Sequence, residues 1–193
     1  MRLSVKWCTI WAAAAALFWR QDAETSHCLL GAVAAGVLSK ALKSAINQPR
    51  PPRGAAALHD PGFPSSHAVT LAFIAAYVWQ ASGGGPLRAV VVLTALAAAG
   101  VRVARGLHSG GQVAGGLTLG VAVAVAWREW VGRLLLPALE VLWGRHRLLA
   151  LGVAASGALA VVAWGRAFDA SRAARSAATR ERGRPQQQPG GRS

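Results

Sequence analysis

The sequence predicts an all-α protein: an integral membrane helical bundle of about six transmembrane helices, with one site at a membrane interface. Apolar residues make up 53% of the chain, and this count leaves out the 22 glycines. Apolar runs alternate with short polar or proline-rich breaks. The last of these runs, Leu148 to Gly165, has 18 uncharged residues, about 27 Å of helix, which is enough to cross a bilayer core. We therefore expect one membrane domain over residues 1–165.

The first predicted span is Trp7 to Trp19, an alanine-rich run with tryptophan at each end, as is typical of membrane interfaces. We interpret Arg20 to His27 as a polar break, and Cys28 to Ile46 as the second helix. Lys40 and Lys43 lie near the end of that helix, where lysine side chains can reach the interface.

Asn47 to Pro64 contains five prolines, which cannot donate backbone hydrogen bonds, and we predict that it is a loop. Three further helices are expected, at Ala68–Trp79, Leu87–Val101 and Gln112–Trp127. Arg128 to Arg147 is mixed in charge and contains Pro137, which favours a short interfacial helix over a span. Leu148–Gly165 would be the last span.

The formal net charge is +14, which favours anionic partners. Nucleic acid is a poor candidate because the core arginines lie between apolar runs, whereas anionic lipid headgroups fit well. Residues 166–193 are predicted to be a disordered basic tail. Cys8 and Cys28 indicate no disulfide framework. The residues before the first apolar run are short for a transit peptide.

The order of the helices brings three polar clusters to the same side of the membrane. Lys43 and Arg50 follow the second helix, and His67 opens the third. The third and fourth helices cross the membrane and return, so Arg102 and His108 lie on that side too. Charged groups at the mouths of several membrane helices are costly and usually functional. Helix starts, as at His67 and Gln112, also favour an anion.

These clusters resemble the three signature motifs of the type 2 phosphatidic acid phosphatase superfamily. The matching patterns are Lys43-x6-Arg50-Pro51, Pro64-Ser65-Ser66-His67 and Arg102-x5-His108, within residues 28–127. The segment Asp60-Pro-Gly-Phe-Pro-Ser-Ser-His67 is similar to the corresponding segments of plant plastid lipid phosphate phosphatases and of dolichyl-diphosphate phosphatases.

The resemblance implies a role for each matching residue. His108 would be the nucleophile that forms a phosphohistidine, and His67 the general acid that protonates the leaving oxygen. The remaining matches would bind the phosphoryl oxygens: Lys43, Arg50, Ser65, Ser66 and Arg102. Neither a metal nor another cofactor is expected.

Two positions depart from the usual third motif. Val101 stands where serine is usual, and Gln112 stands where an aspartate would orient the nucleophilic imidazole. Neutral glutamine can only orient the ring, through its carbonyl, so Gln112 alone suggests reduced activity. Because the plastid and dolichyl-type members also have glutamine there, we interpret it as a subgroup mark. Ser66, where glycine is usual, follows the same subgroup.

Several other polar residues need no role in the site. Contact with solvent or lipid explains His59, His146, Lys40 and Arg105. The small-residue spacing of Gly116 and Gly120 favours packing of the fifth helix within the bundle over formation of a dimer.

We therefore expect a metal-independent lipid phosphate phosphatase that hydrolyses phosphatidate or a related lipid phosphate. Two alternatives stay open at this point: a polyprenyl or dolichyl diphosphate phosphatase, and a catalytically weakened lipid-phosphate binder, which Gln112 motivates. A vanadium haloperoxidase is disfavoured because the whole chain is membrane-like. The expected location is the plastid envelope, with the endoplasmic reticulum as the alternative. Lysine and arginine density favours the cytosolic or stromal face for the site, but much of that density consists of the motif residues themselves, so the side is left open. The oligomeric state is left open.

Overall fold

The computed structural model describes residues 19–53, 60–81, 84–153 and 155–157, and the single residues 159, 163, 167, 170 and 174. The chain divides into two units, 1–154 and 155–193, and the helices described here belong to the first. The predicted first span lies outside the described residues except for Trp19. The predicted tail does so as well, except for residues 167, 170 and 174.

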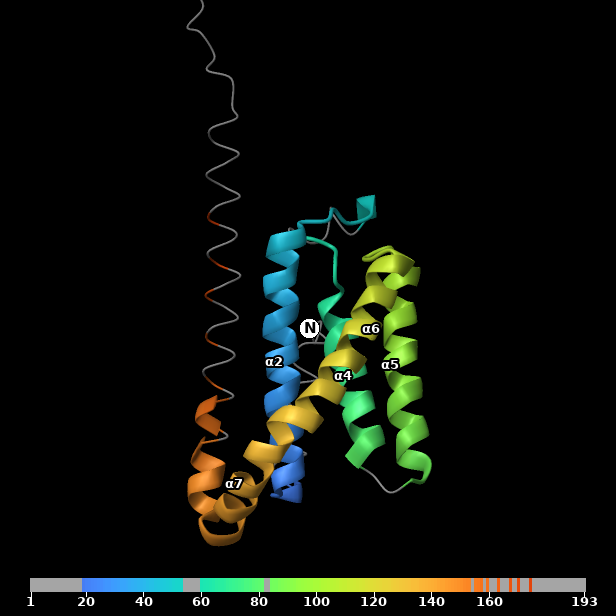
Figure 1. Cartoon of the computed structure of the whole chain (residues 1–193). Coiled ribbons are helices and arrows are strands. Elements are labelled where there is room, and N and C mark those ends of the chain that lie inside the picture. Colours follow the sequence, from blue (N-terminus) through green and yellow to red (C-terminus); the bar gives the residue numbers. More distant parts are fainter. Residues whose placement is uncertain are drawn as a thin grey trace, which may run out of the picture. The chain divides into compact units, whose positions relative to one another are not determined.

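The described part of the chain is helical and contains no strand, which confirms the all-α prediction for these residues. The elements in order are α2 (Ala23–Ile46), α4 (Ser66–Ala81), α5 (Pro86–Ala104), α6 (Gly110–Ala126), the π-helical turn η1 (Trp127–Val131) and α7 (Gly132–Arg145). Figure 1 shows that the end of α2, the start of α4, the end of α5 and the start of α6 lie at one end of the bundle.

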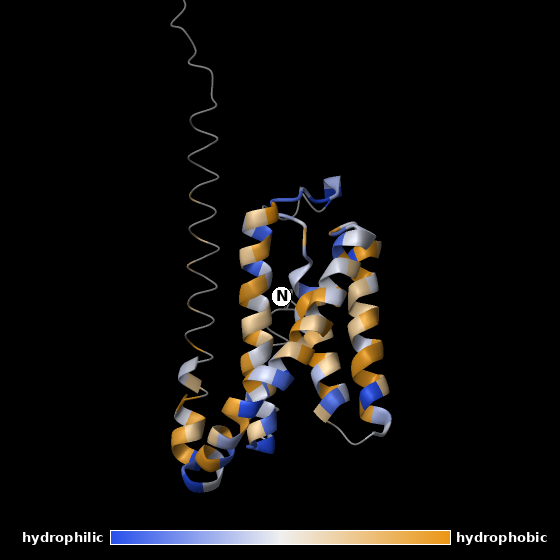
Figure 2. Ribbon diagram, viewed as in Figure 1, coloured by the Kyte–Doolittle hydropathy of each residue, from blue (hydrophilic) through white to orange (hydrophobic). Residues whose placement is uncertain are grey.

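Among the described residues, three helices are long and apolar enough to cross a membrane: Ala23–Ile46, Pro86–Ala104 and the continuous helix Gly110–Arg145. Figure 2 shows hydrophobic residues along much of α2 and α5, and Leu93 and Val90 of α5 are both more than half exposed. Such surfaces suit lipid and indicate association with a membrane. The third predicted span, α4, has 16 residues and falls short of this length.

Helix α4 lies at the centre of the bundle. Its Val69, Phe73 and Tyr77 are buried and pack against Ala32 and Ala35 of α2 and Ala124 of α6. The close approach of α6 depends on glycine, since a Cβ at Gly120 would collide with the Val69 carbonyl and with Ala72. Gly116 is similarly packed against Ser65 and Ala68. Both glycines therefore serve packing within the bundle, as the sequence predicted.

We predicted a polar break from Arg20 to His27, but α2 already begins at Ala23, so the second half of this segment is helical. Asp22 caps α2 by accepting a hydrogen bond from Thr25 N at 2.6 Å, and Glu24 and His27 lie inside the helix. Tyr77 Oη donates to Glu24 Oε2 at 2.7 Å and lies 2.7 Å from His27 Nδ1. Two arginine N–H groups of Arg128 also reach the Glu24 carboxylate. Because Tyr77 and Arg128 bind the Glu24 carboxylate, and Tyr77 also contacts the His27 ring, these two polar side chains can lie within α2.

The predicted break between residues 127 and 128 is also absent, because α6 continues through η1 into α7. Trp127 Nε1 donates to the His27 carbonyl at 3.1 Å, and Arg128 binds Glu24, so both sides of this junction are tied to α2. The π turn adjusts the helix where these contacts form. Pro137 lies inside α7, whose segment we had predicted to be a separate interfacial helix.

Gly120→Ala should destabilise the bundle by over-packing α6 against α4, with a loss of about 1–3 kcal/mol in the free energy of unfolding. Gly100→Ala is the matched control, because a Cβ at Gly100 of α5 meets nothing within 4 Å. It should be neutral or stabilising by up to about 1 kcal/mol. Unfolding of both variants in detergent measures the difference, and equal responses would contradict the packing assigned to Gly120.

Candidate active site

The turn between α5 and α6 holds His108 between two helix caps. Gly106 has a positive φ of 65°, and Leu107 N donates to the Arg102 carbonyl at 3.1 Å while Gly106 N donates to the Val103 carbonyl at 2.8 Å. This is the Schellman arrangement that ends helices. On the other side, Ser109 and Gln112 form a capping box at the start of α6. The backbone on both sides of His108 is therefore determined by capping.

The His108 side chain is buried and makes two well-defined ring contacts. Its Nδ1 lies 3.0 Å from the Gly62 carbonyl, and its Nε2 lies 2.7 Å from Arg50 Nη1. A carbonyl only accepts and a guanidinium only donates. We therefore infer that Nδ1 carries the proton and that Nε2 presents a lone pair.

Burial lowers the pKa of His108 to about 4, and the positive charges of Arg50, Lys43 and Arg102 act in the same direction. The hydrogen bond to the Gly62 carbonyl opposes this shift only in part. The imidazole is consequently neutral at physiological pH. A neutral ring whose Nε2 carries a lone pair, here accepting from Arg50 Nη1, is the state in which histidine can act as a nucleophile once that contact is exchanged.

Arg50 and Lys43 are buried beside His108 and share one carboxylate. Asp60 Oδ2 accepts from Lys43 Nζ at 2.5 Å, and Asp60 Oδ1 accepts from Arg50 Nη2 at 2.9 Å. Arg50 Nε also donates to the Asp60 carbonyl, and Arg50 Nη1 to the Leu107 carbonyl, at 2.8 and 2.9 Å. The structure thus brings the two predicted cations of the first motif to the predicted nucleophile.

Two other predicted groups lie at this end of the bundle with polar atoms that have no hydrogen-bond partner. Ser65 Oγ and Arg102 Nε are both buried, and neither has a partner within the part of the chain that the structure describes. Buried donors without partners are costly, and they are expected where a polar ligand binds. Among the described residues, no group of three His, Cys, Asp or Glu side chains is arranged to hold a metal ion.

The remaining predicted site residues are placed differently from one another. His67 lies partly buried in the first turn of α4, and its role stays a prediction. Ser66 Oγ accepts a hydrogen bond from Ser39 Oγ at 2.8 Å, which directs it toward α2.

The Gln112 side chain bonds to backbone atoms on two sides. Gln112 Oε1 accepts from Ser109 N, and Gln112 Nε2 donates to the Pro49 carbonyl at 2.8 Å. The Gln112 amide therefore joins a cap to the proline-rich loop, and the Gly62 carbonyl contacts the imidazole where we expected glutamine to orient it.

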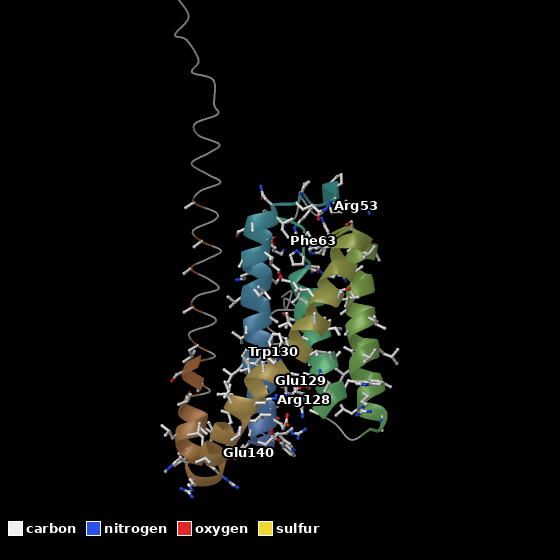
Figure 3. All side chains as sticks on the ribbon, in the orientation of Figure 1. Arg53, Phe63, Arg128, Glu129, Trp130 and Glu140 are labelled. Atoms are coloured by element: carbon white, nitrogen blue, oxygen red, sulfur yellow. The ribbon has the colours of Figure 1, made fainter. Side chains whose placement is uncertain are left out.

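Residues 62–65 lie across the first two turns of α6. A Cβ at Gly62 would overlap the Gln112 amide, and one at Gly115 would overlap the Phe63 ring. Ser65 N donates to the Gln112 carbonyl at 3.1 Å. Figure 3 shows Phe63 at this end of the bundle, next to α6. The second and third motifs are thereby packed directly on each other.

Sequence reasoning missed two participants in the site, Asp60 and the Gly62 carbonyl. An acidic residue seven positions before His67 and among several basic motif residues was a usable signal for Asp60. The Gly62 carbonyl had none, because a backbone oxygen is common to all residues and only its position in space gives it a role.

Comparison with known proteins matches residues 24–136 to the PAP2 superfamily. The chain is 30% identical over 129 residues to lipid phosphate phosphatase epsilon 1, chloroplastic, of Arabidopsis thaliana, covering 63% of this chain and 46% of that protein. It is 32% identical over 163 residues to lipid phosphate phosphatase epsilon 2, chloroplastic, of the same species, covering 80% and 56%. The chain thus spans about half the length of these relatives. No solved structure matches. Because the match includes all three motifs and most of the bundle, the chain belongs to the PAP2 superfamily.

Proposed function

We propose that this chain is a metal-independent lipid phosphate phosphatase that works through a phosphohistidine. The observation that carries the proposal is the neutral His108 imidazole, whose Nδ1–H is bound by the Gly62 carbonyl and whose Nε2 faces the buried Arg50 guanidinium. A lone pair next to cations that can bind phosphoryl oxygens is suited to attack on phosphorus.

In the first step, His108 Nε2 forms a bond to phosphorus and the phosphorus–oxygen bond to the lipid breaks. His67 donates a proton to the leaving oxygen, which releases the lipid alcohol. Arg50 exchanges its contact with Nε2 for a phosphoryl oxygen, and Arg102 and Ser65 supply further donors through their unpartnered buried atoms. Water, deprotonated by His67, then cleaves the phosphohistidine and releases inorganic phosphate.

Gln112 in this mechanism organises the site and does not contact the reacting atoms. Its side chain holds the Ser109 cap and the Pro49 carbonyl, and the Gly62 carbonyl keeps the imidazole tautomer. The absence of an aspartate at this position therefore does not imply a weakened enzyme. This supports the catalytic interpretation over a binding-only role.

A lipid substrate is supported by an apolar surface on the helices that carry the second and third motifs. A hollow of about 350 Å³ lies among α4, α5 and α6 and is lined almost entirely by apolar side chains, including Ala72, Ala95 and Leu117. It begins at Ala72, five residues or about 7.5 Å along α4 from His67, and extends away from the site as far as Gln80. The headgroup would bind at the helix ends while the tails stay in lipid.

We propose phosphatidate or a related lipid monophosphate as the substrate, with a polyprenyl or dolichyl diphosphate as the alternative. The names of the two relatives support a lipid phosphate and suggest the chloroplast, and we propose the plastid envelope as the location. Six spans, with the site at one membrane interface, stay part of this proposal. They add α4 and two segments at the ends of the chain to the three long apolar helices.

The function is tested by phosphate release from purified, detergent-solubilised protein with EDTA present, from phosphatidate and from a polyprenyl diphosphate in parallel. We expect turnover of phosphatidate, and His108→Ala should reduce it by at least about 10⁴-fold because the covalent route is removed. His146→Ala is the matched control, since His146 is an exposed residue at the end of α7. Equal activity of wild type and His108→Ala would refute the mechanism.

The ionisation and tautomer of His108 can be read from the imidazole nitrogen shifts of ¹⁵N-histidine-labelled protein in detergent, assigned with His108→Asn. The pKa should lie near 4, below the ordinary 6.5, so the ring gains a proton only as the pH falls through about 4. Above that pH, Nδ1 should be the protonated nitrogen. Arg50→Gln should raise the pKa by removing a nearby positive charge. A midpoint near 6.5, or a proton on Nε2, would contradict the assigned geometry.

A further inference from the structure

Asp60 belongs to none of the groups predicted to bind phosphate, yet it contacts two of them. Its carboxylate accepts from Lys43 at 2.5 Å and from Arg50 at 2.9 Å, and its backbone carbonyl accepts from Arg50 Nε at 2.8 Å. Any phosphoryl group that reaches Lys43 and Arg50 must share these donors with Asp60 or displace it.

The Asp60 carboxylate is negatively charged at the pH at which it would compete with a phosphoryl group for Lys43 and Arg50. Partial burial acts to raise the pKa of Asp60, but hydrogen bonds and charge from Lys43 and Arg50 outweigh it and hold the pKa below its ordinary value. The Lys43 and Arg50 side chains are only 5% and 3% exposed, whereas that of Asp60 is 36% exposed. Two buried cations thus depend on an anion that can reach solvent.

Asp60 also sets the charge of the site. Three cations, Lys43, Arg50 and Arg102, act on the neutral His108, and the Asp60 carboxylate reduces their sum to a net charge of two. Arg105 is exposed, so water and salt weaken its effect. A phosphate monoester carries about −1.5 to −2 near pH 7. A lipid diphosphate carries a further negative charge on its second phosphoryl group.

The arrangement of hydrogen-bond donors also favours a monophosphate over a diphosphate. Arg102 Nε and Ser65 Oγ, buried without a partner among the described residues, are the further donors that the proposed mechanism gives, with Arg50 Nη1, to the phosphoryl group on His108. The second phosphoryl group of a diphosphate would need Lys43 as an additional donor, and Asp60 already holds it.

We propose that Asp60 is a specificity-determining residue, whose carboxylate holds Lys43 and Arg50 and favours a lipid monophosphate over a lipid diphosphate. The inference rests on the proposed function and deepens it by naming what selects the substrate class. A solely structural Asp60, tying the loop to α2, would instead affect both substrates alike.

The test compares wild type, Asp60→Asn and Asp60→Glu in the same mixed micelles, by kcat/KM for phosphatidate and for a polyprenyl diphosphate. Asp60→Asn keeps the shape of the side chain and removes its charge. We expect the ratio of diphosphate to monophosphate turnover to rise roughly tenfold, as one unit charge in a partly screened site allows. Asp60→Glu restores the charge and should return the ratio toward wild type. A ratio unchanged in Asp60→Asn, or equal loss on both substrates, would overturn the proposal.

Binding of inorganic phosphate and of pyrophosphate, measured by titration calorimetry on the same proteins, makes the test independent of turnover, and its wild-type arm does not depend on whether Asp60→Asn folds. Wild type should bind pyrophosphate less than about tenfold more tightly than phosphate, and Asp60→Asn should widen that preference. A wild-type protein that strongly prefers pyrophosphate would contradict the proposed role of Asp60 in specificity. Wild type without turnover on either lipid would refute the proposed function instead, and the two anion affinities would still decide the role of Asp60.

Discussion

The buried guanidinium of Arg50 is the interaction on which the site depends. A buried arginine must find acceptors for its N–H groups, and Arg50 finds them on both segments that face it. From the loop it takes the carboxylate and carbonyl of Asp60, and from the turn between α5 and α6 it takes the Leu107 carbonyl and His108 Nε2. One side chain therefore sets the distance between the first and third motifs and also lowers the pKa of the imidazole.

The second motif is positioned by close packing as well as by charge. Its Pro-Gly-Phe-Pro segment lies on α6 where Gly115 and Gly116 leave room for Phe63 and Ser65. This contact carries the Gly62 carbonyl to His108 Nδ1 and the start of α4 to the Gln112 carbonyl. The glycines of α6 and the loop are therefore parts of one arrangement, in which small residues allow the backbone approach that orients the imidazole.

At the opposite end of the bundle, a second polar network holds the long helix Gly110–Arg145 to α2. Glu24 accepts from Tyr77 and Arg128, and Trp127 donates to the His27 carbonyl beside the π turn. Figure 3 places Arg128 well away from Phe63, so this network is distant from the site. The Glu24 carboxylate is tolerated inside the helix because Tyr77 and Arg128 of neighbouring helices bind it.

The sequence by itself determined the helical class, the apolar faces and the residues of the three motifs. Apolar periodicity and proline placement report on local structure, and motif order reports on which helix ends share a side. Lys43, Arg50, Ser65, Arg102 and His108 could therefore be named, as could packing at Gly116 and Gly120. Only the tertiary structure decided the boundary of α2, the continuity of α6 with α7, and the partners of Gln112, Asp60 and the Gly62 carbonyl. Each of these depends on an acceptor or donor brought close from a segment distant in sequence, and local pattern does not encode such distances.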